Sequence, residues 1–331
     1  MKRLAPVAVT LLLLAMASMS GLWQQYQQFL LAPLNIDTDG FVLNVERGAS
    51  IRAVVAELER RGATRMGWQW RLLSRLEPLV IKAGEYAVPP GLNALDLLKI
   101  LAAGKVISYR FTIIEGWNLN QLLSEFGKNP VLLHSIQTSA ELKGREGFRA
   151  GNLEGWFLPE TYVFERGGSD LQILQMAYTA MQKALANAWA GRDDGLPYAG
   201  PEELLSMASI IEKETAHEGE RAAIAGVFVR RLQKHWRLEA DPTVIYGMGE
   251  AFTGNIRRSD LKRDSAYNTY TRYGLPPTPI ALPGVAALYA AAHPAMGEAM
   301  FFVANGQGGH TFSDTLKQHN QAVRRLLEHK Q

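Results

Sequence analysis

Leu204-Leu-Ser-Met-Ala-Ser-Ile-Ile-Glu-Lys-Glu-Thr-Ala-His-Glu218 is the stretch around which the rest of the chain is organised. The preceding Gly200-Pro-Glu-Glu203 predicts a helix start, because proline suits the first helical position and carboxylates stabilise the first turn. Thr215 and Glu218 have the spacing of a capping box, which predicts a second helix running to about Lys234. The acids therefore fall at a junction between two helices.

Two glutamates of this stretch, Glu212 and Glu214, compete for a chemical role. On a helix Glu214 lies beside two isoleucines, whereas Glu212 lies beside an alanine and a serine, so Glu214 is expected to be the better desolvated. If the helix continues for another turn, Glu218 adds a second carboxylate, and both effects favour a protonated acid near neutral pH. The alternative is a solvated acidic helix end paired with Lys213 and Arg221.

Composition excludes several classes of function. The 331 residues suffice for two or three domains, and a net charge of +3 with spread lysines and arginines gives no nucleic-acid footprint. The absence of cysteine excludes disulfides, thiolate metal sites and thiol nucleophiles. The seven histidines form no close ligand pair, so neither a metal nor another cofactor is expected.

The N-terminus predicts a membrane anchor over residues 1–31. An apolar run from Leu4 to about Leu22 is roughly long enough to cross a bilayer, and Trp23 and Tyr26 follow where an interfacial aromatic belt lies. The basic Met1-Lys-Arg3 predicts a cytoplasmic N-terminus and an exported remainder. Cleavage of a signal peptide at Ala15-Met-Ala17 is the alternative, but the apolar run continues past that point.

A strand end, a glycine turn, a Ser or Asn cap and an amphipathic helix recur three times after the anchor. The copies begin at Val45-Glu-Arg-Gly-Ala-Ser50, Val88-Pro-Pro-Gly-Leu-Asn93 and Ile113-Ile-Glu-Gly-Trp-Asn118. Units of this kind resemble LysM-like glycan-binding modules, and we expect such a module over 40–108. Ordinary strand-to-helix turns with good caps are the alternative.

The rest of the chain, 109–331, is expected to form a larger mixed α/β catalytic domain, so that the whole belongs to the α+β class. Trp156, in a glycine- and aromatic-rich stretch, suits a platform for a sugar ring and core packing equally well. The further elements expected are a helix from Leu171 to about Ala190, turn-rich loops at 241–249, 267–270 and 274–284, a helix from Gly284 to Ala292, a hairpin within 300–313 and a last helix from Asp314 to His329.

Motifs in a fixed order resemble the YceG-like family over nearly the whole chain. They are Glu154-Gly-Trp-Phe-Leu-Pro-Glu-Thr-Tyr162, Glu212-Lys-Glu-Thr215, Asp241-Pro-Thr-Val-Ile-Tyr246, Tyr267-Asn-Thr-Tyr270, Gly274-Leu-Pro-Pro277, and Gly309-His-Thr-Phe312 with His319-Asn320. Glu160 stands where the family commonly has Asp. The resemblance implies cleavage of peptidoglycan glycan strands between N-acetylmuramic acid and N-acetylglucosamine, leaving a 1,6-anhydro end.

The resemblance also implies that Glu214 is catalytic, the residue that its neighbours favour. Glycosidases usually use two carboxylates. Attack by the substrate's own O6 hydroxyl needs one group, which protonates the leaving O4 and then accepts the O6 proton. For each of the substrate-binding candidates a turn-capping or buried hydrogen-bonding role is the alternative. These candidates are Glu154, Tyr162, Glu218, Asp241, Thr243, Tyr246, Tyr267, Asn268, Tyr270 and His310.

Two rival functions stay open. A two-carboxylate hydrolase would use Glu218 or Asp241 as its partner acid and release reducing ends, whereas a membrane-tethered glycan-binding scaffold would have no catalysis. Serine acyl transfer is disfavoured, because Ser209 lacks the S-x-x-K spacing and no G-x-S-x-G occurs. The resemblance implies a bacterial inner-membrane protein with a periplasmic or extracytoplasmic catalytic domain, trimming or terminating nascent strands beside peptidoglycan synthases.

Overall fold

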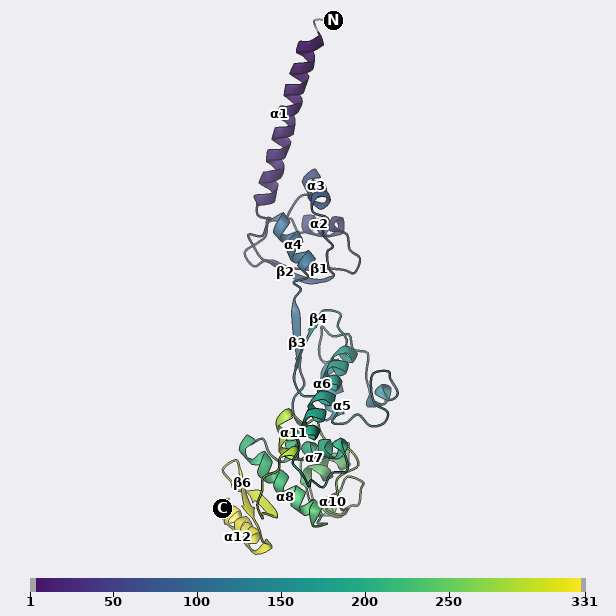
Figure 1. Ribbon diagram of the computed structural model, residues 1–331, viewed down its shortest axis with the longest axis vertical. Coiled ribbons are helices and arrows are strands. Elements are labelled where there is room, and N and C mark those ends of the chain that lie inside the picture. Colours follow the sequence, from purple (N-terminus) through teal and green to yellow (C-terminus); the bar gives the residue numbers. More distant parts are fainter. Residues whose placement is uncertain (1–3, 329–331) are drawn as a thin grey trace. The chain divides into compact units, whose positions relative to one another are not determined.

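The computed structural model describes residues 4–328, with side chains from Val9 onward, and the chain divides into two compact units, Met1–Tyr109 and Arg110–Gln331 (Figure 1). Helices dominate both units, and the strands of the described part form three two-stranded sheets. The expectation of a mixed helix and strand fold is therefore confirmed.

The first unit pairs two strands antiparallel and packs helices onto them. Phe41 lies opposite Val88 and Val45 opposite Gly84. Ser50 and Asn93 cap the following helices through their side chains, as the repeated pattern predicts. The elements are α1 Leu4–Leu31, β1 Phe41–Val45, α2 Ile51–Arg60, α3 Trp68–Leu76, β2 Gly84–Val88 and α4 Ala94–Ala103.

The last turns of α1 belong to the core of this unit. Tyr26 is buried there and its ring contacts that of Trp68, while Phe29 meets Trp70 edge-on. Earlier on the helix the apolar side chains from Val9 to Trp23 are exposed. No helix of the part with described side chains reaches the length and hydropathy of a bilayer crossing. Residues 4–8 of the expected span lie outside that part.

The second unit is built around α7, Pro201–Glu214, which packs against α6, α8, α9 and α11 (Figure 1). Residues 204–211 of α7 are all buried. The other elements are β3 Ser108–Thr112, which begins at the end of the first unit, α5 Leu119–Gly127, η1 Ser139–Leu142, β4 Thr161–Glu165, α6 Asp170–Gly191, η2 Glu218–Glu220, α8 Arg221–Gln233, α9 Asp241–Met248, η3 Gly249–Ala251, α10 Arg258–Lys262, α11 Val285–Ala292, β5 Phe301–Ala304, β6 His310–Ser313 and α12 Leu316–Glu328.

The helices α6 and α11 and the β5–β6 hairpin are confirmed, and α12 begins two residues later than predicted. The prediction that Thr215 opens a second helix with a capping box is wrong. Thr215 ends α7, and its Oγ1 accepts a hydrogen bond from the His217 backbone N–H at 2.9 Å instead of capping toward Glu218. The expectation of a turn over 241–249 is also wrong, because α9 occupies most of it, with Pro242 in its first turn.

Gly155 has a backbone conformation and a close neighbour that a residue with a side chain could not accommodate unless the surrounding atoms moved. Its φ is +83°, and an added Cβ would lie 2.4 Å from Pro279. We expect Gly155→Ala to lower the free energy of unfolding by about 2 kcal/mol or more, because backbone strain and a clash add. Gly167→Ala is the matched control, since its φ is +84° but its Cβ would meet nothing within 4 Å. Urea unfolding compares them, and equal losses would contradict the clash.

Candidate active site

The C-terminal end of α7 is fixed by buried hydroxyls one and two turns earlier. The Ser209 hydroxyl donates to the Ser206 carbonyl at 2.7 Å and accepts from the Ile280 backbone N–H at 3.0 Å. These bonds join α7 to the proline-rich loop at 274–284, which the chain keeps stiff because each proline fixes its own φ. The position of the acids at the helix end is therefore set by the core.

Glu212 has a structural environment. Its carboxylate accepts a 2.9 Å hydrogen bond from the Gly284 backbone N–H at the start of α11, and it lies 3.6 Å from an Arg221 guanidinium nitrogen. Its side chain is only 5% exposed, and burial raises the pKa of Glu212, but the rise is large only for Glu214, the residue that we expected to be the better desolvated. Lys213 turns away and donates to the Gly116 carbonyl at 3.1 Å. What distinguishes Glu212 is that its carboxylate is already partnered.

Glu214, the last residue of α7, is half-buried, and its carboxyl hydrogen-bonds no group within residues 4–328. Burial and then the negative charge of Asp241 raise the pKa of Glu214 to about 8, against the opposing charge of Arg231. The expectation that Glu218 supplies the second carboxylate is wrong, because the helix ends before it and Asp241 takes that place. With a pKa of about 8, Glu214 is expected to be a protonated acid at neutral pH.

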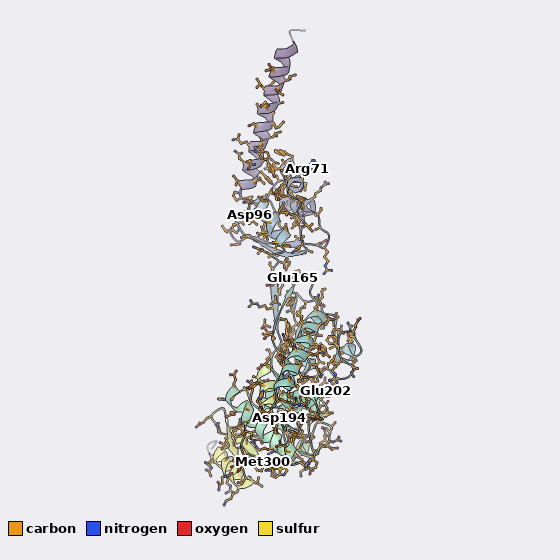
Figure 2. The ribbon with its side chains drawn as sticks, in the orientation of Figure 1. Arg71, Asp96, Glu165, Asp194, Glu202 and Met300 are labelled. Carbon is orange, nitrogen blue, oxygen red and sulfur yellow. The ribbon has the colours of Figure 1, made fainter. Side chains whose placement is uncertain are left out.

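Asp241 and Tyr270 lie close enough to Glu214 to interact with it electrostatically. The Tyr270 hydroxyl donates to Asp241 Oδ1 at 2.6 Å, and Asp241 begins α9. Burial and the bonded carboxylate raise the pKa of Tyr270, so its proton stays on the phenol. Arg231 is held in place by carbonyls, with Nε donating to Met300 and Nη1 to Leu238, at 2.8 and 2.7 Å. Figure 2 labels Met300 just before β5.

A second acid, Glu154, lies buried at the N-terminus of α5. Its carboxylate accepts from the Leu119 backbone N–H at 3.0 and 3.2 Å and from the Tyr246 hydroxyl at 3.0 Å. Burial raises the pKa of Glu154 to about 7 in spite of these bonds. Tyr246 packs edge-on against Tyr267, whose hydroxyl is 2.9 Å from Thr278 Oγ1. Because Asp241 and Tyr246 share α9, this helix connects Glu154 to the surroundings of Glu214.

A cavity of about 540 Å³ adjoins this second cluster. Thr278 belongs to both, and Trp156, Ser206 and the loop at 274–279 line the cavity. Trp156 is buried beneath the Arg149 guanidinium, which pairs with Glu202 at 2.8 Å, the residue labelled near the start of α7 in Figure 2. The cavity is roomy enough for a sugar ring, and Glu214 is not among its lining residues.

Comparisons with known proteins identify the family of the chain. The model of the YceG-like family matches residues 43–325. The chain belongs to the YceG-like family. It is 28% identical, over 92% of its length and 90% of the relative, to a protein of Bacillus subtilis named endolytic murein transglycosylase. A Streptococcus pneumoniae protein of the same name is 25% identical, and the match covers 91% of this chain and 61% of that protein. A crystal structure of a YceG-like protein from Listeria monocytogenes is similar, with 28% identity, a TM-score of 0.51 and coverage of 86% of this chain and 99% of that chain.

Several of the substrate-binding candidates in this YceG-like chain have their polar groups hydrogen-bonded to backbone atoms of the protein. Asn268 is buried and donates to the Arg263 carbonyl at 2.7 Å, and its Oδ1 accepts from the Tyr270 backbone N–H. The Thr243 hydroxyl donates to the Ala240 carbonyl at 2.7 Å. The Tyr162 hydroxyl donates to the Leu158 carbonyl, also at 2.7 Å. These placements favour structural roles, whereas Glu218 is exposed on η2.

Sequence reasoning about the YceG-like site missed Arg231. In the sequence it is one of two adjacent arginines near a helix end, a position where a solvated charge is the ordinary expectation. Its contacts with Leu238 and Met300 lie in segments that no local pattern connects to it. The one available signal was its neighbourhood of apolar residues, Val227-Phe-Val229.

Removing the Tyr246 hydroxyl tests the Glu154 cluster. We expect Tyr246→Phe to lower the free energy of unfolding by about 1 kcal/mol, because the buried Glu154 carboxylate loses a donor. The pKa of Glu154 should rise further, since the Tyr246 bond lowers it. Urea unfolding at neutral pH measures the first effect. The exposed Tyr289, for which the described part shows no hydroxyl hydrogen bond, gives the control Tyr289→Phe, and equal losses would refute the role of the bond.

His310 lies in the β5–β6 hairpin and is hydrogen-bonded to the carboxylate of Glu220 on η2. The His310 backbone N–H donates to Glu220 Oε1 at 2.8 Å, and His310 Nδ1 lies 2.7 Å from Glu220 Oε2. These bonds lower the pKa of Glu220, although burial opposes them. Glu220 therefore contributes stability above its unfolded pKa, and that contribution is lost as the pH falls through the lower folded pKa. We expect Glu220→Gln to cost about 1.5 kcal/mol at about pH 7 and little at about pH 3. Thermal unfolding at both values decides it, and a pH-independent loss would contradict the ionic account.

Proposed function

We propose that the protein is an endolytic murein transglycosylase, which cuts peptidoglycan glycan strands between N-acetylmuramic acid and N-acetylglucosamine. The observation that carries this proposal is the position of Glu214 at the end of the central helix, where burial and Asp241 raise its pKa to about 8 and no group within residues 4–328 hydrogen-bonds its carboxyl. The names of the Bacillus and Streptococcus relatives support it. A glycan-cleaving enzyme needs such an acid at the leaving oxygen.

The proposed reaction uses one carboxyl group twice. Glu214 donates its proton to the glycosidic O4 as the bond from the anomeric carbon to O4 breaks. The muramic acid O6 then attacks the anomeric carbon, and the Glu214 carboxylate accepts the O6 proton. The new bond closes the 1,6-anhydro ring, the proton count balances, and no external water is consumed. We assign to Asp241, which accepts a hydrogen bond from Tyr270, the role of stabilising the positive charge that develops at the anomeric carbon.

Analysis of the product ends tests this reaction. Purified glycan strands are digested with the full chain in water enriched in oxygen-18, and the fragments are examined by mass spectrometry. Anhydro ends without the heavy isotope are expected. Reducing ends carrying it would show instead a two-carboxylate hydrolase, and binding of strands without soluble fragments would show a non-catalytic scaffold.

We also propose that α1 anchors the chain in the bacterial inner membrane, with the N-terminus cytoplasmic and the second unit on the far side. The support is the uninterrupted helix from Leu4, the exposed apolar side chains from Val9 to Trp23, and the basic Met1-Lys-Arg3. Protease protection of the full chain in vesicles tests this anchoring. An unanchored chain would be digested throughout, and a cleaved chain would be released.

We propose a LysM-like glycan-binding role for residues 40–108 of the first unit. The antiparallel β1–β2 pair and the capped turns at Ser50 and Asn93 support this role. A glycan-binding unit beside the anchor would present strands close to where they are polymerised. A partnership with peptidoglycan synthases, in which nascent strands are trimmed or terminated, is proposed from the family resemblance.

A further inference from the structure

The first unit carries a basic cavity between α2 and α3 that the cleavage reaction does not use. Its volume is about 780 Å³, and its lining includes Arg52, Arg71 and Arg75 together with Trp68. No carboxylate lines it, and within residues 4–328 none of the three arginines has an ion-pair partner. The nearby Arg60 and Arg61, by contrast, both pair with Glu57. The cavity is thus lined by three exposed arginines that pair with no carboxylate of the described part of the chain.

The cavity lies beside the base of α1. Trp68, 38% exposed, touches Tyr26, and Trp70 touches Phe29, so the first turn of α3 is packed against the last turns of α1. Figure 1 shows α3 at the end of this unit from which α1 emerges, with β1 and β2 at the opposite end. Arg71 is labelled on that side in Figure 2. If α1 enters a bilayer, α3 is the part of the unit that meets its surface.

We propose that this cavity binds the phosphate headgroups of anionic phospholipids and holds α3 against the membrane surface. The proposal rests on the anchoring of α1 proposed above. Guanidinium groups suit phosphate because their parallel N–H donors match two phosphate oxygens. A half-exposed tryptophan, with an apolar face and a polar N–H, suits the headgroup level. The anionic surface of a membrane also concentrates basic groups within a Debye length.

A membrane contact of this kind would fix the first unit close to the bilayer. Because the last turns of α1 pack into the unit, the helix alone would let helix and unit tilt together in the bilayer, whereas a second attachment at the cavity would limit that tilt. The sheet face formed by β1 and β2 would then point away from the membrane, toward the space that holds the glycan.

The experiment uses the absence of cysteine in the chain. Ser74→Cys, at the cavity, is labelled with a fluorophore in the full chain and reconstituted in nanodiscs that carry a lipid with a nitroxide on its headgroup. One set of discs contains phosphatidylcholine alone, and the other also contains phosphatidylglycerol. Ala87→Cys, exposed on β2, is the matched control. The combined Arg52→Gln, Arg71→Gln and Arg75→Gln variant tests the arginines.

We expect strong quenching at position 74 in discs with phosphatidylglycerol, weak quenching at position 87, and a loss of most of the quenching at position 74 in the triple variant or at high salt. Equal quenching of the triple variant, or equal quenching in both kinds of disc, would overturn the proposal. Displacement of the quenching by millimolar inorganic phosphate would make free phosphate the occupant and overturn the lipid assignment. A chain that fails to elute with the discs would refute the anchor itself, and glycan cleavage by the same preparation reports separately on the enzyme.

Discussion

Glu214→Gln is expected to lower the rate of glycan-strand cleavage by about a thousandfold while leaving the fold unchanged. The amide has nearly the shape of the carboxylic acid but no proton to give to the leaving oxygen. Because the Glu214 carboxyl hydrogen-bonds no group in the described part of the chain, the substitution breaks no internal bond. Release of soluble fragments from glycan strands, followed by chromatography, measures the rate.

Glu298→Gln is the matched control, since it neutralises an exposed carboxylate of the same unit. It should cleave at the wild-type rate. The two variants should also differ in stability at alkaline pH. A carboxyl whose folded pKa is raised destabilises the folded state as the pH climbs from about 4.5 toward about 8, so Glu214→Gln should melt at a higher temperature than the wild type near pH 8. Full activity of Glu214→Gln would remove the acid from the mechanism.

The pH dependence of cleavage should carry the second large effect. An acid with a pKa of about 8 is protonated at neutral pH, so the rate should fall about tenfold for each pH unit above about 8. Asp241→Asn removes the negative charge that, after burial, raises the pKa of Glu214. The alkaline fall of the rate should therefore begin at a lower pH in that variant. Rates at saturating strand concentration, measured across the pH range, follow this shift.

Asp264→Asn provides the comparison for the pH profile. Asp264 is exposed and pairs with Arg272 at 2.9 Å, and it is not among the groups that shift the pKa of Glu214. Its neutralisation should leave the profile in place. An alkaline limb that stays fixed in Asp241→Asn, or that moves equally in both variants, would mean that Asp241 does not act on Glu214.

The parts of the fold that could be predicted are those set by neighbours in the chain. The start of α7 at Pro201, the caps at Ser50, Asn93 and Asn118, and the β5–β6 hairpin follow from residues within a few positions of one another. The end of α7 did not follow. The expected capping box at Thr215 gave way to a tight turn and a short 3-10 helix before α8.

The surroundings of Glu214 could not be predicted, because they depend on segments distant in sequence. Asp241 is positioned by Thr269, which lies 28 positions later and holds the turn before α9. The Thr269 hydroxyl accepts from the Ala240 backbone N–H at 3.0 Å and lies 2.9 Å from Thr243 Oγ1. An apolar wall around Glu214 could be read from the helix pattern, but the identity of its second carboxylate could not. For the same reason Glu218, adjacent in sequence, was the wrong partner.

For His310 and Asn268 the sequence could not distinguish a binding role from a structural one. Both are polar residues in turn-rich motifs, where a binding role and a structural role give the same sequence pattern. The structure places His310 against Glu220, ninety positions earlier, and gives Asn268 three carbonyl acceptors in and just after α10. Only the distribution of hydrogen-bond partners separates such residues from Glu214.

The titration of the Glu214 carboxyl itself tests the central claim most directly. Carboxyl-labelled glutamate is incorporated into the full chain, and the carbon-13 shifts are followed with pH, with Glu214→Gln identifying the resonance. A midpoint near pH 8 is predicted, so that the side chain is a protonated acid where the enzyme works. A midpoint near the ordinary glutamate value of about 4.3 would contradict the account, because Glu214 would then hold no proton to give.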